Sequence, residues 1–99
     1  MLLNNKVTIV TGGASGIGEA TSRRFAQEGA AVVVADTRLG KAETVAADIN
    51  DNGGHAVAIE VDVAEADSVA ALVDSAVTEF GRLDVMFNNA GTLRPGTVL

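Results

Sequence analysis

An eight-residue stretch, TGGASGIG, has the composition of a backbone site for an anion. It holds the glycines Gly12, Gly13, Gly16 and Gly18 and follows a short apolar run. Glycine loses more backbone entropy on folding than any other residue, so four of them in one turn need a physical reason. Bare backbone amides and the positive end of a helix dipole attract phosphate groups. The stretch therefore predicts a phosphate-binding turn between a strand and a helix, whereas a merely flexible turn would need only one glycine.

The spacing of the glycines restricts the kind of phosphate ligand. A nucleoside-triphosphate loop requires Lys and then Ser or Thr after its last glycine, but Glu19 follows Gly18 here. The dinucleotide pattern G-x-G-x-x-G also fails, because Thr21 stands where its third glycine belongs. The pattern that is present is T-G-x-x-x-G-x-G, which begins at Thr11.

A second chemical signal is Asp36, which ends the apolar run AAVVVAD. A carboxylate at the end of a second strand accepts hydrogen bonds from the adenosine ribose and repels a 2′-phosphate, which favours NAD over NADP. Two other interpretations stay open: Arg38 is close enough to contact a phosphate, and a lone Asp at a strand end can cap the next turn. The glycine loop contains no Lys or Arg, which favours NAD.

The elements that must position these residues alternate between two hydrophobic patterns. Short apolar or β-branched runs predict strands at Lys6–Thr11, Ala30–Asp36, His55–Val63 and Leu83–Asn89. Helical spacing of apolar residues predicts helices at Gly16–Gly29, Arg38–Asn52 and about Glu65–Phe80, and the residues after Asn89 are predicted as loop. Strands that alternate with helices indicate an α/β fold with a parallel sheet and right-handed crossovers.

The same spacing predicts which side chains of each helix face the sheet. The predicted inner faces are Ile17, Ala20, Thr21 and Phe25 in the first helix, Ala42, Val45, Ala46 and Ile49 in the second, and Val69, Leu72, Val73, Ala76, Val77 and Phe80 in the third. Ala64 stands where a capping residue is expected before the third helix. Arg23 and Arg24 lie at i,i+4 spacing from Glu19 and Glu28, which predicts ion pairs on a solvated face.

Composition excludes several classes of protein. The chain has 99 residues and a net charge of -6, and it shows no basic stripe of the kind that binds nucleic acid. It has no cysteine and one histidine, so we expect neither disulfides nor a thiolate or histidine metal site. No apolar run approaches the ~18 residues of a membrane span. We therefore expect a cytoplasmic protein that binds no metal, nucleic acid or membrane.

Four segments, in order, resemble the compact single-domain branch of the short-chain dehydrogenase/reductase family. They are TGGASGIG, VVVAD, VDV at Val61–Val63 and NNAG at Asn88–Gly91. The resemblance implies a Rossmann-type three-layer α/β/α domain with strand order 3-2-1-4, of which residues 1–99 form the N-terminal, incomplete part, truncated after the fourth strand. It also implies hydride transfer between NAD and an alcohol or carbonyl substrate, and a homo-oligomeric parent enzyme.

The resemblance assigns a role to each matching position. Gly12 makes the tight turn, Ser15, Gly16, Ile17 and Gly18 wrap the pyrophosphate, and Asp36 holds the adenosine ribose. Asp62 and Val63 contact adenine, and Asn89, Ala90 and Gly91 lie along the ribose on the nicotinamide side. Thr11 and Asn88 are interpreted as structural residues that tie strand ends together. The alternative for Asp62 is a carboxylate that merely flanks the next helix.

The resemblance also implies a set of catalytic groups, which residues 1–99 lack. The family uses a Ser, a Tyr and a Lys four residues after that Tyr, all beyond the fourth strand, and this sequence contains no tyrosine. Its serines, Ser15, Ser22, Ser68 and Ser75, lie in the loop or helices already assigned. We therefore predict no catalytic residue in residues 1–99, and we do not identify a substrate.

Two other functions remain possible at this point. One is a non-catalytic half-domain that binds NAD or a partner chain. The other is a fragment of an S-adenosylmethionine-dependent methyltransferase, whose glycine loop usually follows an acidic residue, whereas Thr11 precedes Gly12 here. The fourth strand is also predicted to be an open sheet edge that favours pairing with another chain.

Overall fold

The computed structural model describes residues 3–89 of the chain. Strands and helices alternate in the order β1 (Val7–Thr11), α1 (Gly16–Gln27), β2 (Ala31–Asp36), α2 (Leu39–Asp51), β3 (His55–Glu60), α3 (Ala66–Phe80) and β4 (Val85–Asn88). Most predicted boundaries agree with these within two residues. The third strand is the exception, because it ends at Glu60 and not at Val63. Beyond it the Asp62 carboxylate accepts a hydrogen bond from the Ala64 amide at 3.0 Å, so the chain turns there.

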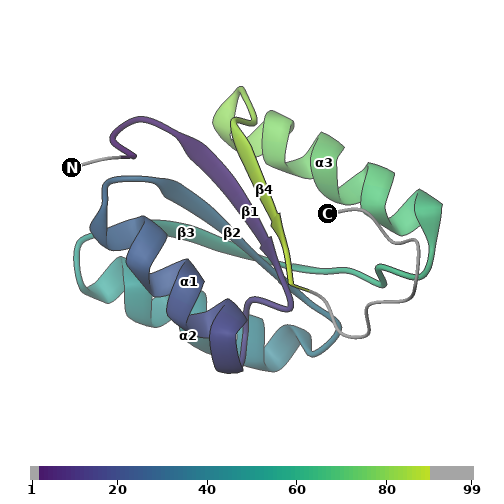
Figure 1. Ribbon diagram of the computed structural model, residues 1–99, viewed down its shortest axis with the longest axis horizontal. Helices are drawn as coiled ribbons and strands as arrows, with labels where there is room; N and C mark the ends of the chain where they lie inside the picture. The colour runs from purple at the N-terminus through teal and green to yellow at the C-terminus, as the bar shows by residue number, and fades with distance from the viewer. Residues whose placement is uncertain (1–2, 90–99) are drawn as a thin grey trace.

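The strands form one parallel sheet in the order β3-β2-β1-β4, as predicted. Thr11 at the end of β1 pairs with Ala35 of β2 on one side and with Asn88 of β4 on the other. The chain proceeds from β1 towards β3 and then returns to the other side of β1 (Figure 1). Ligands of open α/β sheets bind at such a reversal, outside the carboxyl ends of the strands.

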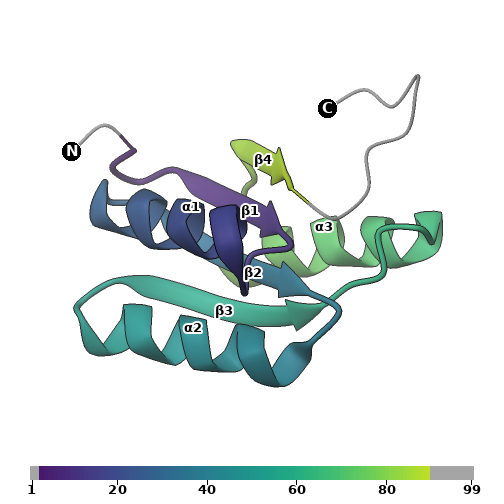
Figure 2. The ribbon, with the colours of Figure 1, turned by 60° about the horizontal axis from the view of Figure 1, so that its bottom comes forward.

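Helices cover both faces of the sheet (Figure 2). One buried cluster joins α1 and α2 to the sheet and includes Val10, Val32, Val34, Ala42, Val45, Ala46 and Ile49. The other joins α3 to the opposite face and includes Ile9, Val33, Ala35, Leu72 and Ala76. Successive residues of β1 and β2 therefore enter different cores, which explains why these strands are apolar without alternation.

The inner face of α2 is confirmed, since all four of its predicted residues are buried. The prediction for α1 is wrong at its first turn, where Ile17 is 70% exposed and Ala20 is exposed as well. The buried residues of α1 are Gly18 and Ser22. Ser22 donates a hydrogen bond to the Gly13 carbonyl at 3.3 Å, so this helix approaches the loop through small residues and not through an apolar stripe.

Helix α3 also differs from its prediction in two details. Val77 is 42% exposed, although the other predicted residues are buried or pack against the core. The N-cap residue is Glu65 and not Ala64, and its side chain makes no capping hydrogen bond.

The two ion pairs predicted on α1 are confirmed. Arg23 pairs with Glu19, and Arg24 pairs with Glu28, each at 2.9 Å. Within residues 3–89 no cluster of acidic or histidine side chains could hold a metal ion. No helix in this part of the chain is both long and apolar enough to cross a membrane.

Candidate functional site

The predicted site residues gather at the carboxyl ends of the four strands. The glycine loop follows β1, Asp36 ends β2, Asp62 and Val63 follow β3, and Asn89 follows β4. In a parallel sheet these ends share one edge. Ala90 and Gly91 lie outside the described residues.

The glycine loop packs backbone against backbone. Gly12 and Gly16 have φ of 62° and 58°, which is left-handed backbone that glycine adopts without strain. A Cβ on Gly18 would lie 1.8 Å from the Gly12 carbonyl oxygen, and one on Gly13 would lie 2.8 Å from the Val10 carbonyl oxygen. By contrast, no atom lies within 4 Å of the Cβ position on Gly16, so this side of the loop is open.

The N-terminus of α1 faces this loop without a side-chain cap. Ser15 is the N-cap residue, with extended φ and ψ of -156° and 157°, but its hydroxyl makes no capping bond. The Ser15 Oγ accepts a hydrogen bond from Arg38 Nη2 at 2.7 Å instead. The first amides of the helix therefore keep the partial positive charge that attracts an anion.

Asp36 connects the end of β2 to the glycine loop. Its Oδ2 accepts a hydrogen bond from the Ala14 amide at 3.1 Å, and its Oδ1 accepts one from the Arg38 amide at 3.0 Å. Arg38 Nε lies 3.5 Å from the same Oδ1, and the Asp36 side chain is 5% exposed. The turn-capping interpretation of Asp36 is thus confirmed.

Electrostatics keep this buried carboxyl ionised. Burial alone would raise the pKa of Asp36. The hydrogen bonds from the Arg38 and Ala14 amides and the charge of Arg38 lower the pKa by more than burial raises it. The net result is a pKa below the ordinary value of an aspartate. Asp36 is therefore a hydrogen-bond acceptor at neutral pH, as a contact to sugar hydroxyls requires.

Asp62 and Val63 lie on an exposed turn before α3. The Asp62 amide donates to Ser68 Oγ at 2.9 Å, and the Asp62 Oδ1 accepts from the Ala64 amide. This geometry matches the alternative in which Asp62 flanks the helix. Val63 is 38% exposed, which leaves its side chain available for contact with a ligand.

A hydrogen-bond network joins the ends of β1 and β4. The fully buried Thr11 donates from Oγ1 to Asn88 Oδ1 at 2.9 Å and accepts from the Asn89 amide at 3.0 Å. Asn89 Nδ2 lies 3.0 Å from the Cβ position of Gly18. The expected tie between Thr11 and Asn88 is therefore present, and it places Asn89 beside the glycine loop.

The structure adds residues that the sequence pattern does not reveal. The Ala14 amide holds Asp36, and the Gly13 amide donates to the Ala35 carbonyl at 3.0 Å, so the loop is fixed to β2 at two positions. Arg38 was predicted only as a phosphate contact, and its bond to Ser15 has no signal in the sequence beyond its position two residues after Asp36.

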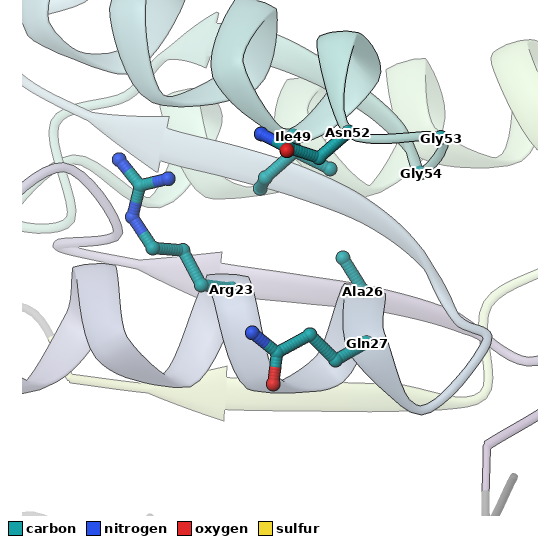
Figure 3. Close-up of a pocket in the computed structure, with 7 residues that line it drawn as sticks. All are labelled: Arg23, Ala26, Gln27, Ile49, Asn52, Gly53 and Gly54. Atoms are coloured by element: carbon teal, nitrogen blue, oxygen red, sulfur yellow. The ribbon is translucent and has the colours of Figure 1, made fainter.

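A cavity elsewhere in the structure does not coincide with these residues. It lies between α1 and the end of α2, has a volume of ≈ 230 Å³ and is lined by Arg23, Ala26, Gln27, Ile49, Asn52, Gly53 and Gly54 (Figure 3). Gly53 and Gly54 precede β3, so the cavity lies towards the amino ends of the strands. None of the predicted site residues lines it.

A family model described as short chain dehydrogenase matches residues 6–99. The chain belongs to this family. A cis-4-hydroxycyclohexanecarboxylate dehydrogenase of Sinomonas cyclohexanicum is 51% identical over 90 residues, which cover 91% of this chain and 36% of that protein. Tropinone reductase-like 1 of Erythroxylum coca is 47% identical over 91 residues, which cover 92% of this chain and 32% of that protein.

A solved structure supports the same assignment. The crystal structure of a hydroxysteroid dehydrogenase from Escherichia coli aligns with a TM-score of 0.89 and 38% identity, over 91% of this chain and 38% of that one. The chain thus spans about a third of the length of these three proteins. Membership of this family decides against the methyltransferase alternative.

Proposed function

We propose that residues 1–99 form the NAD(H)-binding part of a single Rossmann domain in a short-chain dehydrogenase. The whole enzyme would transfer a hydride between the nicotinamide cofactor and an alcohol or carbonyl substrate. The named relatives are dehydrogenases and a reductase-like protein, which supports this reaction class.

The residues present fit a dinucleotide. The close approach of Gly18 to Gly12 leaves no side chain between the loop and the start of α1, while the side of Gly16 is open. The observation that carries the proposal is the hydrogen bond from the Ala14 amide of this loop to the Asp36 carboxylate. It fixes an ionised acceptor for ribose hydroxyls against an anion-binding loop, which is the pairing that an adenosine diphosphate moiety requires.

The charges in the site favour NAD over NADP. The buried Asp36 carboxylate would repel a 2′-phosphate, and the loop itself contains no cation. The positive charge nearest to Asp36 among the described residues is that of Arg38, whose guanidinium is already engaged by Asp36 and Ser15.

Each of the predicted site residues then has a binding task, and none has a catalytic one. Ser15 and the amides from Gly16 to Gly18 would hold the pyrophosphate, and Asp36 would hold the adenosine ribose. Val63 and Asp62 would border adenine, and Asn89, with Ala90 and Gly91, would border the ribose near the nicotinamide. When bound, the nicotinamide ring supplies or takes the hydride. The sequence has no tyrosine to transfer the accompanying proton.

The same glycine loop and Asp36 carboxylate also fit a second candidate, a half-domain that binds NAD without catalysis. Titrations of the protein with NADH and with NADPH, followed by cofactor fluorescence, test the shared binding step. We expect NADH to bind at least tenfold more tightly, the effect of about 1.4 kcal/mol. Equal affinities would contradict the preference for NAD, and the absence of binding by either cofactor would contradict both functions. Alcohol-dependent reduction of NAD by the same protein would exclude the non-catalytic alternative.

A further inference from the structure

Arg38 connects the two halves of the proposed site through a single side chain. Its Nη2 donates to Ser15 Oγ at 2.7 Å, and its Nε lies 3.5 Å from Asp36 Oδ1. We call these two contacts the Arg38 bridge. The Arg38 side chain is 51% exposed, whereas that of Asp36 is 5% exposed, so the bridge lies on the outer side of the carboxylate.

The Arg38 bridge bears on which hydrogen bonds the Ser15 hydroxyl makes. A serine at an N-cap normally accepts a hydrogen bond from the amide two or three residues later, here Ile17 or Gly18. Ser15 makes no such bond. Its oxygen instead accepts from the guanidinium, whose position holds the hydroxyl towards Arg38. An oxygen that accepts from a charged donor leaves its own hydrogen available, and the accepted bond polarises the hydroxyl towards donation.

We propose that Arg38 is a positioning residue that holds the Ser15 hydroxyl as a phosphate donor and keeps it away from the first amides of α1. Both the hydroxyl hydrogen and the amides are then directed to the phosphates of an adenosine diphosphate moiety. Without Arg38, Ser15 would rotate to cap α1 and would compete with the phosphate for those amides. The inference rests on the proposed function, since it concerns the same ligand.

Two simpler roles for Arg38 predict different behaviour. If the guanidinium contacted a phosphate itself, its contribution would not depend on Ser15. If it only stabilised the Asp36 carboxylate, its contribution would be the same for a ligand without phosphates. The Ser15 hydroxyl and the phosphates are therefore the two variables that an experiment must change.

The test is a double-mutant cycle on the intact protein with Arg38→Met, Ser15→Ala and the double variant, each checked for folding by circular dichroism. Calorimetry measures the affinity for adenosine 5′-diphosphate, and ligand-observed NMR measures that for adenosine. Lys41→Met removes an exposed cation from the adjacent turn of α2 and is the matched control. We expect each single variant to bind the diphosphate about tenfold more weakly, the effect of one charge-assisted hydrogen bond.

The affinity of the double variant for the diphosphate distinguishes positioning from two independent contacts. Positioning predicts that it binds the diphosphate about as weakly as either single variant, that adenosine binding is unchanged by Arg38→Met, and that Arg38→Lys restores part of the loss. A loss of about a hundredfold in the double variant would mean two independent contacts and would overturn the proposal, as would equal weakening of adenosine. If the unmodified protein bound neither the diphosphate nor NADH, the proposed function would fail instead.

Discussion

The carbonyl oxygen of Gly12 lies 1.8 Å from the position that a Cβ would occupy on Gly18. The carbonyl oxygen belongs to the backbone and the backbone of Gly18 fixes the Cβ position, so no rotamer change can relieve this contact. We expect Gly18→Ala to push α1 away from the loop, to destabilise the fold by about 1 to 3 kcal/mol and to remove NADH binding. Urea denaturation and cofactor titration measure the two effects.

Gly40 is the matched control for this substitution. It lies in the first turn of α2, and no atom lies within 4 Å of its Cβ position. Gly40→Ala should therefore increase the stability by about 0.5 to 1 kcal/mol through helix propensity alone. If both variants had the same stability as the unmodified protein, the inference that the loop packs closely on α1 would be wrong.

The Asp36 carboxylate is expected to set the choice of cofactor. Asp36→Asn keeps the shape of the side chain but removes the charge that repels a 2′-phosphate. We expect the affinity for NADH to fall roughly tenfold and the discrimination against NADPH to shrink or disappear. Parallel titrations with the two cofactors measure the ratio. A variant that keeps the original preference for NADH would show that the selectivity arises elsewhere.

Asp84 should make the stability depend on acid pH. Its Oδ2 accepts from the Val7 amide at 2.8 Å, and its own amide donates to the Val7 carbonyl at 2.9 Å, which pairs the start of β4 with β1. The bond from Val7, followed by the bond from Arg82, lowers the pKa of Asp84. A lowered pKa stabilises the fold at pH values above the ordinary value of an aspartate, about 3.9, and this contribution is lost as the pH falls through the folded pKa.

Thermal melts between pH 7 and pH 3 test this linkage. The unmodified protein should lose more stability over that interval than Asp84→Asn, which lacks the titrating group. Asp74→Asn changes an exposed carboxylate on α3 and should leave the melting midpoint at pH 7 unchanged. Parallel pH curves for the unmodified protein and Asp84→Asn would refute the proposed role of the carboxylate.

The strands and α2 were predictable because their signals are local. β-Branched runs such as VVVAD specify a strand without reference to the rest of the chain, and the spacing of Ala42, Val45, Ala46 and Ile49 specifies one helix face. The predicted inner face of α1 was wrong at its first turn because this helix contacts the loop through Gly18 and Ser22. Ile17 was assigned inwards from its hydrophobicity, but the close approach at Gly18 turns it to the outside.

The site was predictable to the extent that backbone geometry determines it. The glycine spacing and the position of Asp36 follow from the sequence, because a bare loop and an acid at a strand end have specific uses. The bond between Arg38 and Ser15 was not predictable, since it depends on the rotamer of a long side chain across the gap between loop and helix. The three residues of Val61–Val63 continue an apolar pattern, and only the hydrogen bonds of Asp62 show that the strand has already ended.

The two edges of the sheet are protected unequally, which predicts self-association of the 99-residue chain. On β3, the Asn50 carboxamide donates to the Ala56 carbonyl at 2.9 Å and accepts from the Ala56 amide at 2.8 Å, so it occupies the edge as a partner strand would. Among residues 3–89, no side chain pairs with the outer edge of β4 in this way. Val85 and Met86 on that strand are each 37% exposed.

An open apolar edge invites pairing with a second chain, and an inserted charge opposes it. We expect light scattering after gel filtration to show a mass that rises with concentration for residues 1–99. Met86→Lys should weaken this association roughly tenfold, the effect of about 1.4 kcal/mol. Val77→Lys introduces the same charge at a valine of α3 that is 42% exposed, and it should leave the mass unchanged. A monodisperse monomer at high micromolar concentration, or equal effects of the two lysines, would show that β4 is not the associating edge.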